Sequence, residues 1–303
     1  MNDWTGRALD ELLRLRDRSG AWGYRNDRGP SAEPTALACL GLWSCRSHSP
    51  PEARRGAIQR GADWLQTLQK ADGSLGIAPS LPSPCWATPH AILLWNALEV
   101  HAPARRRAAA WLLEQKGNPL AVDAAYLGSV VGHDPTLVGW PWVEGTHSWV
   151  EPTAMAILAL DREGLAYHPR VTEGIRVVLN RALAQGGWNY GNTSVFGRQL
   201  RPQPGPTGLA LLALAAHASE HRPRSVDPAI TYLLRTLPDV RAPISLAWGI
   251  LGLRAWNASP AAAADWLAES YSLHAGRRDV TAGLSLLLLA HGDDPFVSRE
   301  PRS

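Results

Sequence analysis

The chain has few of the residues that mark several common classes of protein. Only three of its 303 residues are cysteine, and no two of them form a Cys-x-x-Cys pair. Three cysteines are too few for a disulfide framework, so a reducing compartment is expected. No apolar run approaches the ~20 residues that span a bilayer, and the charged segment 1–20 is unlike a signal peptide. The sequence therefore predicts a cytoplasmic protein without a transmembrane segment.

Strong charge of one sign is also missing. The 30 basic and 27 acidic residues leave a net charge of +3, and the arginines are scattered among acids. Without a basic stripe that could follow phosphates, a nucleic-acid partner is not predicted. Tryptophan is abundant by contrast, because 14 residues of this type outnumber the six tyrosines and two phenylalanines. The composition, 45% hydrophobic and 19% charged, is that of a globular protein.

Six apolar runs recur along the chain, and each opens on a similar residue pair. The first residues of these pairs are Pro34, Pro89, Pro152, Pro206, Pro243 and Val280. The runs behind them are apolar on nearly every face, as expected of helices that are buried on all sides. Proline favours the first turn of a helix, where its missing N–H is not needed. Six buried helices are therefore predicted.

Charge-rich segments with an amphipathic pattern alternate with these runs. They cover residues 4–18, 54–69, 104–116, 170–184, 226–236 and 260–271. In the second of them Ile58, Ala62 and Leu65 fall on one face and charged residues on the other. Six buried and six amphipathic helices in alternation predict an all-α fold, an α/α toroid of six inner and six outer helices (an α6/α6 barrel). A further helix is expected near 120–131.

The ends of the amphipathic segments carry a recognisable signature. The stretch "RGADWLQTLQKADGSLG" at 60–76 resembles the Gln-Trp repeat of the squalene–hopene cyclase and terpenoid cyclase family, with Leu75 in place of the closing tryptophan. Further versions are "LAQGGWNYGN" (183–192), "RSGAWGY" (18–24) and the shorter "AAAWLLEQKG" (108–117). The resemblance covers most of the chain. It implies the α/α toroid shared by terpenoid cyclases, protein prenyltransferase β subunits and the thioester domains of complement-like proteins.

The resemblance also bears on domain organisation. Full triterpene cyclases of this family carry two such domains, and a chain of this length resembles one of them. We therefore expect a single toroid domain over residues 1–291 and an exposed C-terminal tail over residues 292–303.

Acidic residues gather at the predicted starts of the buried helices. The residue before the aligned pair is Glu33, Glu151 or Asp279 in three of the six repeats. If all six helices start at the same mouth of the ring, these carboxyl groups share it. A purely structural explanation stays open, because an acid at a helix N-terminus gains about 0.3–1 kcal/mol from the helix dipole and can bond free backbone N–H groups.

The resemblance implies a chemical role for one of these acids. Class II cyclases protonate an alkene or epoxide with the middle aspartate of a D-x-D-D-T-A motif, and "WVEPTA" at 149–154 puts Glu151 in that place. Trp149 and Pro152 replace the flanking acids, and D-x-D-D occurs nowhere in the chain, which counts against ordinary class II catalysis. If the protein is catalytic, Glu151 is the predicted acid. Glu33, Asp279 and His147 are then predicted to tune it or to move a second proton.

Other chemistries of the superfamily have weaker support, and no metal or cofactor is predicted. "HGDDPF" at 291–296 is a poor match to the acid-rich helix that holds Mg²⁺ in class I enzymes, and is better explained as a solvated helix end. Thr281 stands where the prenyltransferase zinc site needs a cysteine, and Cys85 and His90 lack further ligands. The Cys-Gly-Glu-Gln thioester motif is absent.

Aromatic residues concentrate in the long loops and at the starts of buried helices. The densest stretch is "GWPWVEGTHSWVE" at 139–151, where His147 lies four residues before Glu151. Such residues can wall an isoprenoid pocket, stack on a sugar or hold a cation. The predicted substrate-binding residues are Trp86, His90, Trp140, Trp142, Trp149, Trp188 and Tyr190. Trp22 and Trp188 are also explained as pins between adjacent outer helices.

These observations predict a protein that binds an isoprenoid-like apolar small molecule in a central cavity and, if catalytic, cyclises it by protonation. Two alternatives remain open. One is a non-catalytic toroid that binds a ligand or a protein. The other is a carbohydrate-active α/α barrel, in which paired carboxyl groups stand about 5–9.5 Å apart.

Overall fold

The protein is almost entirely helical, as predicted, and it divides into two compact units. The computed structural model describes residues 4–46, 51–84, 86–120, 132–217 and 222–296. The first unit comprises residues 1–112, 240–247 and 261–295, and the second the remainder of the chain. Each predicted buried run and each amphipathic segment forms a helix. The further helix predicted near 120–131 lies, from residue 121 onward, outside the described residues.

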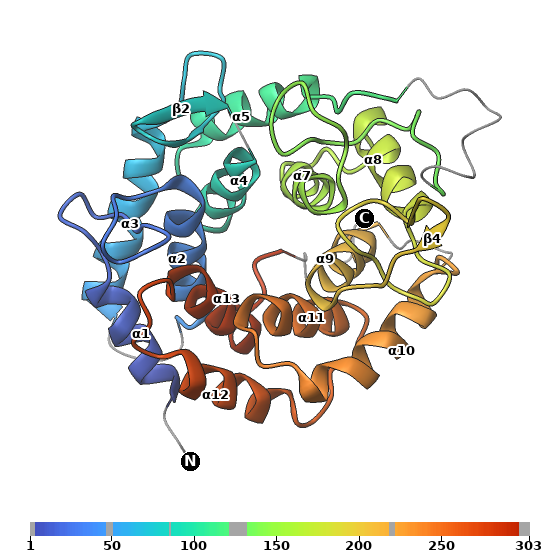
Figure 1. Ribbon diagram of the computed structural model, residues 1–303. Coiled ribbons are helices and arrows are strands. Elements are labelled where there is room, and N and C mark those ends of the chain that lie inside the picture. The colour runs from blue at the N-terminus through green and yellow to red at the C-terminus, as the bar shows by residue number, and fades with distance from the viewer. Residues whose placement is uncertain (1–3, 47–50, 85, 121–131, 218–221, 297–303) are drawn as a thin grey trace. The chain divides into compact units, whose positions relative to one another are not determined.

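The first unit is built from two layers of helices. Its elements are α1 (Trp4–Arg14), α2 (Ala32–Ser44), α3 (Pro51–Thr67), β1 (Gly76–Ala78), β2 (Leu81–Pro84), α4 (Ala87–Ala97), α5 (Ala102–Glu114) up to residue 112, α11 (Pro243–Ala255) up to residue 247, α12 (Ala263–His274) and α13 (Thr281–His291). Figure 1 shows α2 beside α13, with α1, α3 and α12 covering one side of this pair. The strands β1 and β2 form a short antiparallel hairpin in which Ala78 pairs with Leu81.

Small residues let α2 and α13 approach closely. A Cβ atom added to Gly41 of α2 would lie 2.7 Å from the carbonyl oxygen of Ser285 in α13, so only glycine fits there. The Ser44 hydroxyl donates to the carbonyl oxygen of Leu288, 3.1 Å away, and so ties the same two helices together. These contacts explain why both helices are apolar on nearly every face.

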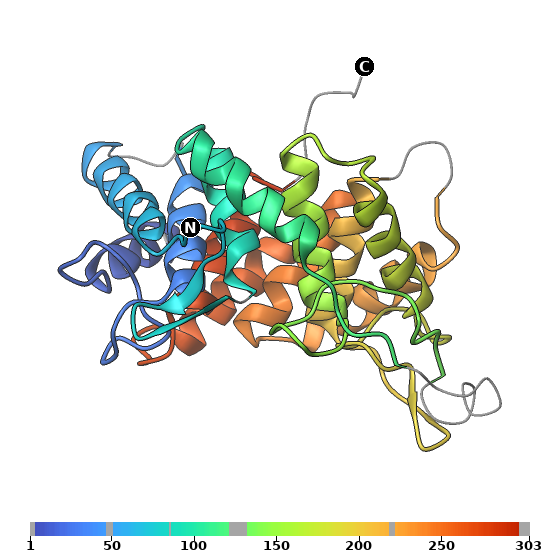
Figure 2. The same cartoon turned by 90° about the horizontal axis from the view of Figure 1, so that it is seen from above.

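The second unit repeats the same arrangement. Its elements are α7 (Val150–Arg162), α8 (Pro169–Asn180), β3 (Ser194–Val195), β4 (Arg198–Gln199), α9 (Pro204–Ala215), α10 (Val226–Thr236), a 3₁₀ turn (Leu237–Asp239) and, from residue 248 onward, α11 (Pro243–Ala255). The buried helices α7 and α9 pack together and are covered by α8 and α10. In Figure 2 the yellow loop that carries β3 and β4 projects beyond the helices of its unit.

A threonine fixes the start of four buried helices in the same way. The hydroxyl oxygens of Thr35, Thr88, Thr153 and Thr207 each accept a backbone N–H bond of 2.9–3.0 Å from the preceding loop. This shared bond corrects the predicted repeat alignment, which placed Pro89 in the same column as the other prolines. The second repeat is displaced by two residues, so Trp86 occupies the position that Glu33 and Glu151 hold in their own repeats.

The donors of these four bonds are Trp22, Leu75, Trp140 and Trp188. The indole of Trp22 donates to the Leu12 carbonyl oxygen in α1 at 2.7 Å, and its ring lies 3.2 Å from where a Cβ of Gly61 in α3 would be. Trp22 therefore pins adjacent amphipathic helices, as predicted. Trp188 makes the corresponding indole bond to the Val178 carbonyl oxygen in α8 at 2.7 Å.

The described part of the predicted C-terminal tail, residues 292–296, is not exposed. We expected residues 292–303 to be exposed, yet Pro295 and Phe296 are buried. The ring of Phe296 packs against Trp248, with 5.6 Å between the ring centroids. Burial of this aromatic surface is favourable, which explains why the chain continues in contact with the helices past α13. Within the described ranges, no helix is long and apolar enough to cross a membrane.

Candidate functional site

In the first unit, three of the predicted site residues come together around the start of α2. Glu33 is half-buried in the first turn of this helix. Its Oε2 accepts hydrogen bonds from the Tyr24 hydroxyl at 2.5 Å and from the Trp86 indole at 2.9 Å. His90 follows in α4, where its Nδ1 lies 3.2 Å from the carbonyl oxygen of Trp86. The result is a carboxylate held between two aromatic donors, with an imidazole close by.

His90 has a perturbed electrostatic environment. Its side chain is buried, with 4% of the residue exposed. Burial lowers the pKa of His90 below its ordinary value of 6.5, while the Glu33 carboxylate and the Trp86 carbonyl oxygen act in the opposite direction. His90 is therefore a neutral imidazole at neutral pH. In that form one ring nitrogen can donate a hydrogen bond while the other accepts one.

In the second unit, the start of α7 carries the predicted acid. Glu151 is half-buried at the second position of the helix, behind the N-cap residue Trp149. The backbone N–H of Val150 donates to the carbonyl oxygen of Tyr190 at 2.9 Å. The loop around Tyr190 also passes close to the Trp149 ring, because a Cβ on Gly191 would lie 2.9 Å from that ring. The structure thus brings Glu151, Trp149 and Tyr190 to one place.

A small cavity of about 120 Å³ lies beside this helix start. Trp149 and the exposed His147 contribute to its wall, together with Arg181 and Asn192. The His147 Nδ1–H donates to the carbonyl oxygen of Asn118 at 3.0 Å. This bond fixes the imidazole against the cavity wall, and only Nε2 is left to meet a ligand.

Two predicted binding residues are parts of the core of their unit. Trp140 is 2% exposed, and the guanidinium of Arg170 stacks on its ring at 4.3 Å from the centroid. Trp188 is completely buried. Both occupy the loop position of Trp22, which explains their burial. Trp142, by contrast, is half-buried.

Asp279 makes none of the contacts to Glu33 described above. It is exposed, directly before α13, and borders a cavity of about 170 Å³ together with His274 and Arg277. The loop that carries Tyr24 does reach this region, because the Asn26 N–H donates to the carbonyl oxygen of Arg278 at 2.9 Å. This bond joins the two loops, and the proximity of Glu33 and Asp279 themselves stays a prediction.

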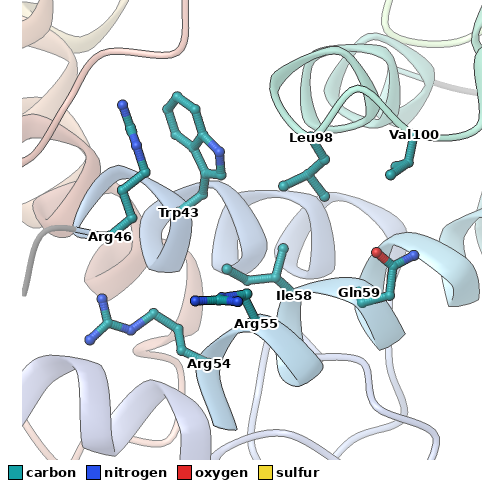
Figure 3. A pocket seen from close by; sticks show the side chains of 8 residues that line it. All are labelled: Trp43, Arg46, Arg54, Arg55, Ile58, Gln59, Leu98 and Val100. Atoms are coloured by element: carbon teal, nitrogen blue, oxygen red, sulfur yellow. The ribbon is translucent and has the colours of Figure 1, made fainter. Parts of the chain in front are cut away.

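Sequence reasoning missed a larger cavity of about 460 Å³ at the opposite ends of α2 and α4. In Figure 3 the arginines Arg46, Arg54 and Arg55 lie toward one side of it, and Leu98 and Val100 lie toward the other. Two of the guanidinium groups already have partners. Arg46 pairs with Asp293 at 3.0 Å and stacks on Trp43, while Arg54 donates to the Cys45 carbonyl oxygen at 2.5 Å.

The Asp293 pair also accounts for the "HGDDPF" stretch, whose first aspartate ties the end of α13 to the end of α2. Cys39 and Cys45 are free thiols buried in the first unit, and burial raises the pKa of the Cys45 thiol. Cys85 lies outside the described residues. Within the part of the chain that the structure describes, no three His, Cys, Asp or Glu side chains are grouped to hold a metal ion.

The sequence matches no protein-family model and no curated protein. Solved structures, however, match over almost the whole chain. The type II terpene cyclase MstE from Scytonema superposes with a TM-score of 0.61 at 16% identity, over 95% of this chain and 97% of the cyclase. A protein from Actinoplanes gives 0.58 at 19% identity, over 91% and 81% of the two chains. The chain has the fold of the terpene cyclase-like α/α toroids.

The same fold serves other chemistry as well. An α-amylase from Clostridium perfringens matches with a TM-score of 0.59 at 12% identity, over 93% of this chain and 95% of the amylase. Variants of MstE have been solved with geranylgeranyl dihydroxybenzoate, its substrate, and with merosterolic acid A, its product. At these identities the likeness establishes the fold, and function has to be argued from this chain's own residues.

Proposed function

We propose that the protein binds an isoprenoid-like apolar small molecule and cyclises it by protonation, with Glu151 as the acid. The observation that carries the proposal is the position of Glu151. It lies two residues before a threonine that fixes the helix start, in a fold shared with a cyclase that takes a geranylgeranyl substrate. Trp149 and Tyr190 beside it supply aromatic surface for an apolar ligand.

The reaction balances without a redox partner. The Glu151 carboxylic acid gives its proton to one alkene carbon, and the resulting cation is attacked by further double bonds of the same molecule. A water molecule then takes a proton from a carbon next to the last cation, and Glu151 regains a proton from solvent, so the product is an isomer of the substrate and the acid is restored. Aromatic faces stabilise the intermediate cation by cation–π attraction.

Incubation with C15 to C30 isoprenoids, followed by mass spectrometry of the products, tests this function. Glu151→Gln keeps the shape of the side chain but removes the acid, and it is expected to lower turnover by about 10²-fold or more. Glu163→Gln, at the other end of α7, is the matched control and is expected to behave as wild type. Undiminished turnover by Glu151→Gln would remove Glu151 from the role of the acid.

Glu33 is tested in parallel, because it holds the corresponding position in the first unit. A loss of turnover in Glu33→Gln with normal turnover in Glu151→Gln would reassign the acid to Glu33. Ligand binding is measured separately by quenching of tryptophan fluorescence. Saturable binding of an isoprenoid without any product would favour the non-catalytic ligand-binding alternative, and absence of binding would contradict the proposal altogether.

A carbohydrate-active function is the second candidate, supported by the shared fold of the Clostridium perfringens amylase. Exposed or half-buried aromatic residues such as Trp142 and Tyr190 suit stacking on sugar rings. Release of reducing sugar from starch, lost in Glu151→Gln or Glu33→Gln, would support this function in place of the first.

A further inference from the structure

A buried arginine in the second unit forms no ion pair with any carboxylate of the described residues. Arg181 directly follows α8 and is 5% exposed. Its Nη1 donates to the carbonyl oxygen of Gly191 at 3.1 Å. Its Nε is buried without a hydrogen-bond partner, and no carboxylate in the described ranges forms an ion pair with it. A buried charge without an opposite charge nearby is destabilising, so an anion bound to the guanidinium would stabilise this part of the protein.

The other buried arginine of this unit differs from Arg181 in having a carboxylate partner, although its Nε is likewise buried without a hydrogen-bond partner. Arg170 is paired with Glu173 at 2.7 Å and donates to the carbonyl oxygens of Gln115 and Val138. The Asp134 carboxylate acts on Arg181 electrostatically, without forming an ion pair with it. Burial lowers the pKa of Arg181 to about 10, and the Asp134 carboxylate offsets only part of that effect. Arg181 therefore stays charged at neutral pH in a site that disfavours its charge.

Arg181 faces the cavity of about 120 Å³ beside the start of α7. His133, His147 and Asn192 line the same cavity, and no aspartate or glutamate appears among its described lining residues. At about 30 Å³ for each water molecule in the liquid, the volume corresponds to a few waters or one small polyatomic anion. The polar side chains of the wall can therefore donate hydrogen bonds to an anion of this size.

We propose that this cavity binds a small oxyanion, a carboxylate or phosphate group, with Arg181 as its counter-ion. The planar guanidinium presents paired donors that match the two oxygens of such a group. The ligand is either a free anion or the head group of an organic molecule, because Leu120, Leu137 and Trp149 add apolar surface to the wall. The cavity shares Trp149 with the proposed cyclisation site, but its test does not use turnover, so the two proposals can fail separately.

Isothermal titration with inorganic phosphate tests the site, with chloride at equal ionic strength as the blank. Arg181→Met fills the same space without charge and is expected to raise the dissociation constant for phosphate at least tenfold. Arg176→Met, which removes an exposed arginine of α8, is the matched control and is expected to bind as wild type. Phenyl phosphate forms a second arm. Tighter binding than inorganic phosphate identifies an organic head group, whereas equal binding identifies a free anion.

Binding of either probe that is lost in Arg181→Met supports the site. Wild type that binds neither probe, or Arg181→Met that binds as tightly as wild type, overturns it. Because Arg181 also holds the Gly191 loop, His147→Gln is made as a second variant at the exposed rim. It is expected to weaken phosphate binding severalfold, and if Arg181→Met does not fold, unchanged binding by folded His147→Gln overturns the proposal.

Discussion

The group around Glu33 shows how one substitution between repeats changes a site. Two repeats carry glutamate at the second position of a buried helix, and the repeat between them carries Trp86. The indole N–H of Trp86 donates to the carboxylate of Glu33, and the backbone carbonyl oxygen of Trp86 lies 3.2 Å from Nδ1 of His90. A single side chain thus orients an acid and bounds a buried histidine. Its contribution is positional, because an indole neither gains nor loses a proton at ordinary pH.

The burial of His90 predicts a specific pH dependence of stability. Because its folded pKa lies below 6.5, the unfolded chain binds the proton more readily than the folded one. The contribution of His90 to the free energy of unfolding should therefore fall as the pH falls from 6.5 toward the folded pKa. Above pH 6.5 this contribution should stay constant. Urea unfolding of wild type and His90→Gln between pH 5 and 8 measures this. The free energy of unfolding of wild type should fall relative to that of His90→Gln toward acid pH. A difference between the two proteins that does not change with pH would contradict the assigned environment of His90.

At the scale of the element, the loop tryptophan sets the packing between helices. Trp22 lies over the backbone of α3 at Gly61, where a Cβ would clash with the Cys39 sulfur and press on the indole. Gly56 in the same helix faces only the end of the Arg60 side chain, 3.5 Å away. The two glycines therefore differ in role, although both stand in the interior of α3.

This difference predicts opposite effects of the same substitution. Gly61→Ala should lower the free energy of unfolding by about 1–3 kcal/mol, because the buried contact has no room for a methyl group. Gly56→Ala should be neutral or raise it by up to ~1 kcal/mol, since alanine is the better helix former. Chemical denaturation of the two variants beside wild type measures both. Equal effects would mean that Trp22 does not rest on α3.

The helices were predictable because the spacing of apolar residues reflects which helix faces are buried. All six buried runs and all six amphipathic segments form helices. The details at the helix starts were less predictable. The second repeat was aligned with the others on Pro89, although the hydrogen bond that defines the register is made by Thr88. Trp140 was grouped with Trp142 and Trp149 because its loop is long, whereas its position is that of Trp22. The burial of Arg181 could not be predicted, because a sequence does not show which of its many arginines lie in the interior.

At the scale of the whole molecule, a fold shared at 16% identity over 95% of the chain needs an explanation. Buried helices tolerate many apolar sequences as long as volume and pattern are kept. The constraints that remain are local: a threonine at the helix start, a large side chain in the loop before it, and glycine where backbones meet. These few positions preserve the fold, while the acids and aromatics at the helix starts are free to change chemistry.

The two compact units share helices, which bears on the predicted single domain. Residues 243–247 of α11 belong to the first unit and residues 248–255 to the second. Because a helix propagates cooperatively along its hydrogen bonds, melting one part of α11 should destabilise the other. We therefore expect a single calorimetric unfolding transition for the chain.

Gly61→Ala in the first unit and Thr207→Val in the second should each shift that same peak to lower temperature. The second change leaves the buried Trp188 N–H without its acceptor, at a cost of about 1–3 kcal/mol. Two peaks, each moved by only one of the variants, would instead establish two independently folding domains.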